Sequence, residues 1–287
     1  RSFQDVSTGG AAVGVPGILR MLAQAHKEHG KLPWAKLFER AISLSENGFA
    51  ISPRLHAMIR RSKDLKDFPT ARAYFLTPQG AAKPAGTLLR NPALAKTYRQ
   101  LAKNGAEEFY RGDIARDIAA AVGNAIRNPA VMTTVDIAEY RPKIRKPICR
   151  PYRTWRVCGM PPPTSGGVTT LQILGLLEGF DMSRVPPSSA EAVHLISEAS
   201  RLAYADRGRY IGDSDFVSVP VDGMLDAAYL RRRAALISNG ESIGKASPGH
   251  PRGAENERFS DDESEGFPST SHLSVIDRDG NAVSMTS

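Results

Sequence analysis

The segment 270–286 constrains the fold of this chain more than any other part of the sequence. Polar and apolar residues alternate from His272 to Ile276, which is the pattern of a β-strand. The next five residues, Asp277–Asn281, are turn-forming, because Asp, Gly and Asn tolerate the positive φ of tight hairpin turns. Small and apolar residues resume from Ala282 to Thr286. The sequence therefore predicts a β-hairpin with Thr270 just before its first strand.

The stretch before this hairpin is acidic. Glu255–Gly266 is rich in charge and includes the run Asp-Asp-Glu-Ser-Glu-Gly at 261–266. It has few apolar residues to bury, so we expect an exposed, mobile linker. Such a linker, leading into a strand preceded by Thr, suits a proteolytic processing site. By itself it suits an ordinary interdomain linker equally well.

The chain up to about Tyr140 is predicted to be mostly helical, because apolar residues recur there at helical spacing. Helices are expected at Ile18–His29, Ala35–Asn47, Ile51–Lys63, Asn91–Asn104 and Asp113–Arg127. Gly48 and Gly105 are placed to end two of them. Pro69–Thr87 is expected to be rich in loops.

Residues 141–254 are predicted to mix strands and helices. Tyr152–Cys158 has strand composition, and helices are expected at Leu171–Phe180 and Ala192–Arg207. Cys149 and Cys158 fall on what look like adjacent short strands. A cross-strand disulfide would form if the two face each other in an oxidising compartment. We expect instead two buried free thiols.

A proline-rich turn leads into the helix predicted at Leu171–Phe180. Met160–Gly167 reads Met-Pro-Pro-Pro-Thr-Ser-Gly-Gly, and its prolines fix an extended backbone. Thr164 or Ser165 is suited to cap the following helix, whose first NH groups can bind an anion or a carboxylate. The segment is either a simple strand-to-helix turn or part of an active-site wall.

Composition excludes several classes of protein. The net charge of +8 and the pI of about 9.6 raise the question of nucleic-acid binding. The basic stretches 141–153 and 231–233 are not interleaved with stacking aromatics, so we predict solvated surfaces and no nucleic-acid partner. No apolar run is long enough for a transmembrane helix, and no signal peptide is visible at Arg1. No His/Cys/Asp cluster has zinc-ligand spacing, so no metal is expected.

Four segments in order along the chain together resemble the γ-glutamyltranspeptidase family. They are Gly14–Gly17, Met160–Gly167, Leu202–Phe216 and 270–286. Thr164 replaces a serine of the family pattern, and Ser214 stands where the family usually has proline. The resemblance implies an α+β fold, the αββα sandwich of N-terminal-nucleophile hydrolases, here incomplete. The family's donor-carboxylate arginine and oxyanion residues are expected before Arg1 and after Ser287.

The resemblance also implies a domain organisation. Residues 1–269 would be a portion of the large subunit: mostly helical at 1–140, mixed at 141–254 and an acidic linker at 255–269. Residues 270–287 would begin the small subunit with the hairpin.

The same resemblance implies the site residues. Thr270 would be the nucleophile, released by self-cleavage of the Ser269–Thr270 bond. An N-terminal Thr can use its own α-amino group as base, because that amine titrates near neutrality. Three small-subunit residues (Ser271, His272 and Thr286) and three turn residues (Ser165, Gly166 and Gly167) are expected to support the substrate site. No cofactor is expected.

The function implied is γ-glutamyl transfer or hydrolysis. The donor would be glutathione or another γ-glutamyl amide, the acceptor an amino acid, a peptide or water, and the large subunit would pair with the small one. The family is usually periplasmic or secreted. Two alternatives remain: a glutaryl or cephalosporin acylase of the same fold, and an inactive fragment or pseudoenzyme that acts as an assembly partner. Asp206 and Arg207 are predicted to be structural.

Overall fold

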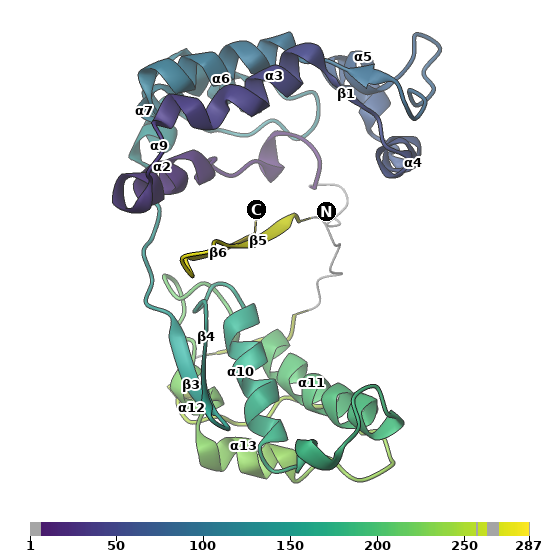
Figure 1. Cartoon of the computed structure of the whole chain (residues 1–287), viewed down its shortest axis with the longest axis vertical. Helices are drawn as coiled ribbons and strands as arrows, with labels where there is room; N and C mark the ends of the chain where they lie inside the picture. The colour runs from purple at the N-terminus through teal and green to yellow at the C-terminus, as the bar shows by residue number, and fades with distance from the viewer. Residues whose placement is uncertain (1–6, 257, 263–269, 287) are drawn as a thin grey trace. The chain divides into compact units, whose positions relative to one another are not determined.

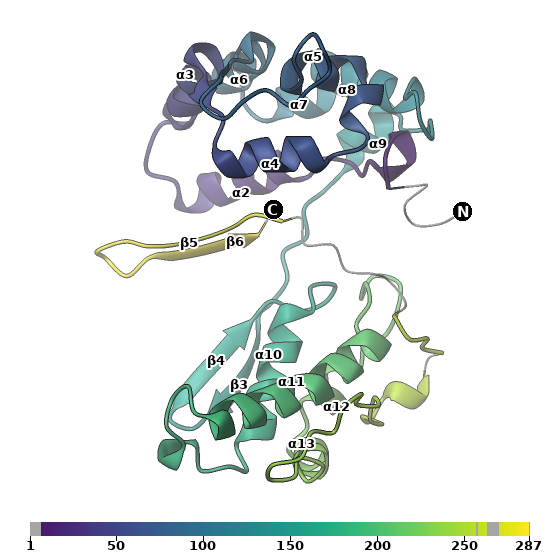
Figure 2. The same cartoon turned by 90° about the vertical axis from the view of Figure 1, so that its right-hand side faces the viewer.

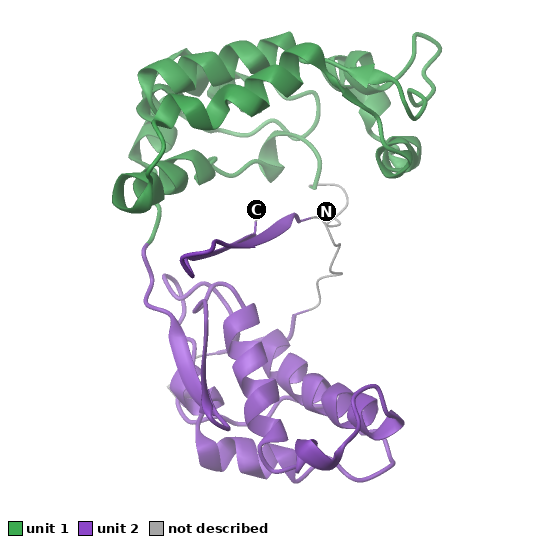
Figure 3. Ribbon diagram, viewed as in Figure 1, with its two compact units in different colours: residues 1–143, 287 green, residues 144–286 purple. Residues whose placement is uncertain are grey.

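The structure is a computed structural model, and it describes residues 7–256, 258–262 and 270–286. These residues divide into two compact units, one ending at Lys143 and the other running from Ile144 to Thr286 (Figure 3). Each unit contains apolar cores of its own.

The first unit is mainly helical (Figure 1). Its elements are η1 (Gly10–Ala12), α2 (Ile18–His29), η2 (Trp34–Phe38), α3 (Glu39–Asn47), β1 (Phe49–Ala50), α4 (Pro53–Arg61), η3 (Leu65–Asp67), α5 (Pro69–Phe75), β2 (Leu88–Leu89), α6 (Pro92–Asn104), α7 (Glu107–Arg111), α8 (Asp113–Gly123) and α9 (Thr134–Glu139). Strands β1 and β2 form a short antiparallel pair. One core gathers around the buried Tyr110, Ala115 and Ile137, and a second around Ile51, Ile59, Leu76 and Leu89.

Local signals in the sequence account for many of these boundaries. Helix α2 has the predicted bounds, and α6 ends where predicted, at Gly105 with φ 85°. The Asn91 side chain accepts a hydrogen bond from the Leu94 amide and thereby caps α6. Gly48, also at φ 85°, ends α3 as expected.

Other expectations for this unit were wrong in detail. Helix α5 occupies Pro69–Phe75, where loop was expected. Helix α8 stops at Gly123 and does not reach Arg127. The Arg127 guanidinium, beyond the end of the helix, pairs with Asp64 and Asp67, both at 2.6 Å.

The second unit mixes strands and helices (Figure 2). Its elements are β3 (Ile148–Tyr152), β4 (Trp155–Gly159), α10 (Gly166–Leu177), η4 (Met182–Arg184), α11 (Ala190–Tyr210), α12 (Val221–Met224), α13 (Ala227–Ala234), η5 (Ala254–Asn256), β5 (His272–Ile276) and β6 (Ala282–Thr286). Helix α10 lies against α11, α13 and the β3–β4 hairpin. The main core lies between these helices and includes Leu176, Leu195, Ala199, Leu202 and Leu230.

The helix starts in this unit differ from the prediction by a few residues. Helix α10 begins at Gly166, within the last residues of the Met160–Gly167 turn and five residues before the predicted start. Helix α11 begins at Ala190 because the Ser189 hydroxyl accepts a hydrogen bond from the Ala192 amide. Because of this cap, the helix starts two residues before the predicted position. The helix ends at Tyr210.

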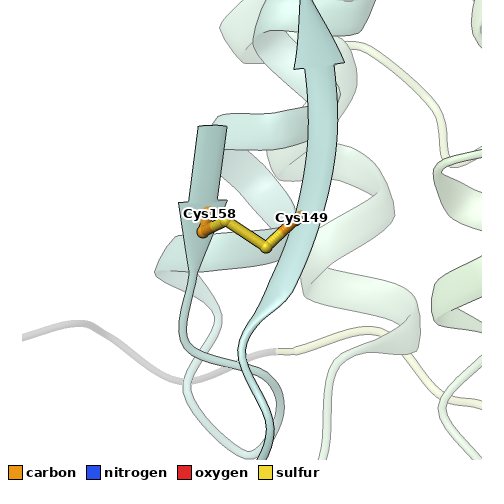
Figure 4. The surroundings of a disulfide bond; sticks show 2 residues. All are labelled: Cys149 and Cys158. Atoms are coloured by element: carbon orange, nitrogen blue, oxygen red, sulfur yellow. A yellow bond between two sulfur atoms is a disulfide. The ribbon is translucent and has the colours of Figure 1, made fainter. Parts of the chain in front are cut away.

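The two cysteines form a disulfide, so the expectation of buried free thiols was wrong (Figure 4). Cys149 on β3 lies directly opposite Cys158 on β4, with the Cα atoms 4.1 Å apart. Cys149 is half-buried and Cys158 is exposed. The disulfide therefore joins β3 to β4, the strand that leads into the proline-rich turn.

Candidate active site

The hairpin predicted at 272–286 is present with the predicted bounds. Strands β5 and β6 pair antiparallel, with His272 opposite Thr286 and Ile276 opposite Ala282. Asp277 closes the turn, because its carboxylate accepts hydrogen bonds from the Asp279 and Asn281 amides, both at 2.9 Å. The hydrogen bonds from the Asn281 side chain and backbone hold the pKa of Asp277 below its ordinary value. The turn that fixes the register therefore carries its own stabilising contacts.

Thr270 lies outside regular secondary structure, two residues before β5, and is exposed, as is Ser271. Ser269, the other residue of the predicted cleavage site, lies outside the described residues. The position of Thr270 matches the expectation of a residue just ahead of a strand.

One face of the hairpin carries a group of hydrogen-bonding side chains. His272 Nδ1 lies 2.8 Å from Thr286 Oγ1, across the strand pair. His272 Nε2 lies 3.0 Å from Ser274 Oγ and 3.2 Å from Ser284 Oγ. These contacts orient the imidazole from both of its nitrogens. The structure thus brings together His272 and Thr286, and it adds two serines that the sequence analysis did not select.

The proline-rich turn is fixed by close backbone packing. Ser165 is the residue before α10, but its hydroxyl does not cap the helix, so this part of the prediction was wrong. Its carbonyl accepts hydrogen bonds from the Thr169 amide and hydroxyl. A Cβ on Gly167 would lie 2.1 Å from the Met160 carbonyl oxygen, whereas a Cβ on Gly166 would meet nothing within 4 Å. Gly167 is therefore required by packing, and Gly166 faces open space.

Two of the motifs singled out from the sequence meet at this turn. Arg207 Nε, on the last turns of α11, donates to Ser165 Oγ at 3.0 Å. Ser214 Oγ donates to the Pro162 carbonyl at 3.3 Å and accepts from Arg145 at 3.1 Å. Ser214, one of the two departures from the family pattern, thus contributes a hydroxyl that links the loop after α11 to the proline-rich turn.

Asp206 has a structural role, as predicted. It is 1% exposed, and its two carboxylate oxygens accept from Gln172, Tyr229, Arg233 and the Gly249 amide at 2.7–3.2 Å. Burial and the Asp206 charge raise the pKa of the Tyr229 phenol, so the phenol keeps its proton and remains a donor. The carboxylate has no free access to solvent and joins α10, α11, α13 and the 249 loop.

Thr270 and the proline-rich turn make no direct polar contact with each other in the described part of the chain. Across the described residues, no hydrogen bond or ion pair joins Thr270, or the hairpin that follows it, to Ser165, Gly166 or Gly167. In the same part of the chain, no group of three or more His, Cys, Asp or Glu side chains is placed to hold a metal ion.

Comparison with known proteins identifies the family. The profile of the family described as Gamma-glutamyltranspeptidase matches residues 1–287, the whole chain. The chain belongs to the γ-glutamyltranspeptidase family. A glutathione hydrolase proenzyme of Escherichia coli K12 is 36% identical over 282 residues, which are 97% of this chain and 46% of that protein. An acylase ACY 1 proenzyme of Pseudomonas sp. SE83 is 34% identical over 100% of this chain and 48% of its own length.

The fold of the chain also matches a solved structure of this family. The γ-glutamyltranspeptidase of Helicobacter pylori superimposes with a TM-score of 0.78 at 33% identity, covering 85% of this chain and 70% of the other. The predicted α+β class, that of N-terminal-nucleophile hydrolases, is confirmed. The chain spans about half the length of the curated relatives it matches. None of the helices in the described ranges has the length and apolar character needed to span a bilayer.

Proposed function

We propose that the protein containing this chain is a γ-glutamyl transferase and hydrolase that acts on glutathione or related γ-glutamyl amides. The family match over the whole chain supports this function, as does the likeness to a protein named glutathione hydrolase proenzyme. The observation that carries the proposal is the position of Thr270. It is an exposed hydroxyl residue two positions before a hairpin whose turn and polar face are both held by hydrogen bonds.

The proposed maturation step creates the catalyst. The Thr270 hydroxyl attacks the carbonyl carbon of Ser269, the C–N bond breaks, and the acyl group moves from nitrogen to oxygen. Breaking that C–N bond frees the α-amino group of Thr270. Water then hydrolyses the resulting ester, which leaves a carboxylate on Ser269 and restores the Thr270 hydroxyl. That amine titrates near neutrality, so a useful fraction is unprotonated and can act as a base.

The proposed turnover uses the same two groups. The amine takes the proton of the Thr270 hydroxyl as the oxygen attacks the γ-amide carbon of the donor. The ammonium returns a proton to the leaving amine, and a γ-glutamyl ester remains on Thr270. An amino acid, a peptide or water then attacks the ester and frees the hydroxyl. We assign Ser271, His272 and Thr286, with the Ser165–Gly167 turn, to the support of this site, and no cofactor takes part.

The proposal includes the subunit organisation. Residues 1–269 belong to the large subunit, which pairs with a small subunit that begins at Thr270. We propose a periplasmic or secreted location. The disulfide between Cys149 and Cys158 supports it, because such bonds persist in oxidising compartments.

An acylase is the second candidate. The relative named acylase ACY 1 proenzyme matches this chain along its whole length at 34% identity, close to the value for the glutathione hydrolase proenzyme. A glutaryl donor differs from a γ-glutamyl donor by the absence of the α-amino group. The two activities therefore need the same nucleophile and differ in how the donor's amine is recognised.

A matched pair of substrates tests the function. The protein from the full reading frame is assayed with γ-glutamyl-p-nitroanilide and with glutaryl-p-nitroanilide at equal concentrations. The proposal predicts a clear preference for the γ-glutamyl compound, and faster release of nitroaniline when a dipeptide acceptor is added. Preference for the glutaryl compound would assign an acylase. Release from neither compound, by a protein that stays uncleaved, would favour a pseudoenzyme.

A further inference from the structure

The described part of the acidic linker is attached to the end of α11. We call residues 258–262 the tether segment. It lies in the second unit, before Thr270 in sequence, and its contacts involve four consecutive α11 residues, Arg207–Tyr210. From its composition, this stretch was expected to be an exposed, mobile linker. The two aspartates at its end are exposed, but the segment is held at specific points.

The first point of attachment is apolar. The Phe259 ring lies edge-on to the Tyr210 ring, with the centroids 5.1 Å apart. Phe259 also packs on the core formed by Val168, Tyr210 and Met224. An aromatic side chain packed on a core in this way contributes far more than an exposed ion pair.

The second point of attachment is polar. The Asp262 amide donates to the Gly208 carbonyl at 2.8 Å. The Arg209 guanidinium lies 3.0 Å from the Asp261 carboxylate, and Arg207 lies 3.9 Å from the Asp262 carboxylate. The basic end of α11 is thus matched by the acidic residues of the tether segment.

Arg207 connects the tether segment to the proline-rich turn. Its Nε donates to Ser165 Oγ at 3.0 Å while its Nη1 faces Asp262. The chain that leads to Thr270 therefore starts beside the turn that we assign to the substrate site. Thr270 follows Asp262 by eight residues, and extended chain covers at most about 3.3–3.6 Å per residue. Thr270 accordingly lies within about 29 Å of this point.

We propose that the tether segment positions the scissile bond for cleavage before Thr270, with Phe259, Asp261 and Asp262 as positioning residues. This inference rests on the proposed function. Among the described residues upstream of the tether, Ala254 packs on the same core, and it precedes Thr270 by sixteen residues. In the loop-closure relation, doubling the number of residues between two points of a chain lowers the effective concentration of one point at the other about threefold. Loss of the tether should slow cleavage by at least that factor.

Cleavage kinetics in the full-length protein test the inference. The protein is made by cell-free synthesis, and cleavage is followed on gels over time. Phe259→Ala combined with Asp261→Arg is expected to slow cleavage by up to about threefold, because the contacts of Asp262 with Gly208 and Arg207 remain. Asp261→Arg alone should slow it less, and adding Arg209→Asp should restore the rate by re-forming the ion pair with reversed charges. Glu241→Arg makes the same charge change at an exposed site and should cleave like the wild type.

Turnover by the cleaved fraction separates positioning from general damage. Each variant's cleaved molecules are expected to release nitroaniline at the wild-type rate, because Phe259 and Asp261 do not belong to the proposed site. Equal cleavage rates in the wild type and the double variant would overturn the inference and leave the proposed function intact. The inference also fails if the charge swap gives no rescue. An uncleaved wild type would overturn both proposals.

Discussion

Two regions of the second unit place polar side chains in opposite environments, one buried and one exposed to solvent. The buried carboxylate of Asp206 accepts four hydrogen bonds. One comes from α10, two come from side chains of α13, and one comes from a loop amide. On the β5–β6 hairpin, His272 and Thr286 contact each other on an exposed face. Thr270 beside them is exposed, with no described contact that it must keep for stability.

This difference separates structural residues from candidates for chemistry. A buried charge is tolerated only when it is paired and hydrogen-bonded. Asp206 meets that requirement. Its contacts with the elements packed around α11 account for its burial, so no catalytic role is needed to explain it. An exposed Thr needs no such explanation from stability. Substitutions should therefore affect stability in the first region and the reaction in the second.

The largest effect is expected at Thr270. In the full-length protein, Thr270→Ala should abolish cleavage and lower turnover at least about a thousandfold, because the attacking oxygen is removed. Thr270→Ser keeps both the hydroxyl and the amine and should retain part of each activity. Gels report cleavage, the anilide assay reports turnover, and circular dichroism checks that both variants fold. A cleaved, active Thr270→Ala protein would remove Thr270 from the mechanism.

The next effect is expected at Asp206. Asp206→Ala leaves the Arg233 guanidinium buried without its carboxylate, which should cost about 3–5 kcal/mol of unfolding free energy. Asp213→Ala, at an exposed aspartate of the following loop, is the matched control and should cost less than about 1 kcal/mol. Urea unfolding in the Thr270→Ala background measures both, so that every variant has the same uncleaved chain. Equal costs at the two positions would remove the distinction between buried and exposed carboxylates.

A smaller effect is expected in the proline-rich turn. Gly167→Ala places a methyl group 2.1 Å from the Met160 carbonyl oxygen, and the forced backbone shift should cost about 1–3 kcal/mol. Gly166→Ala meets open space and should be neutral or stabilise the helix by up to about 1 kcal/mol. The same urea titration compares the two neighbours. A greater loss for Gly166→Ala than for Gly167→Ala contradicts the packing described here.

The smallest effect concerns pH and a second buried carboxylate of α11. Burial of Glu198 raises its pKa, but hydrogen bonds from Ile243 and Ser242, with the Arg201 charge, outweigh burial and lower the pKa overall. A lowered folded-state pKa stabilises the protein above the ordinary value of 4.5, and this contribution is lost as the pH falls through the lowered pKa. Melting temperatures between pH 6 and pH 3 should fall less steeply in Glu198→Gln. If the melting temperature falls equally steeply in the wild type and in Glu198→Gln, titratable groups other than Glu198 cause the acid sensitivity.

The sequence predicted the elements whose signals are local. Helix α2 follows from its apolar periodicity after Pro16 and Gly17. The β5–β6 hairpin follows from alternation and from the turn residues at 277–281. The position of Thr270 before the first strand required nothing more than this local pattern.

The features that the sequence did not predict depend on contacts between distant residues. Cys149 and Cys158 bond because the strand register places them opposite each other, and the sequence does not fix that register. The donors to Asp206 come from positions 172, 229, 233 and 249, which no local pattern connects. The tether segment looked like free linker because its partners lie on α11, some fifty residues earlier in the chain.

The N-terminus of the processed protein tests the central claim most directly. The protein is expressed from the full reading frame, and its fragments are analysed by intact mass and N-terminal sequencing. We predict a small subunit whose first residue is Thr270, with the sequence Thr-Ser-His-Leu. A chain that stays joined at Ser269–Thr270, or one cut elsewhere, would contradict the assignment of Thr270 as an N-terminal nucleophile.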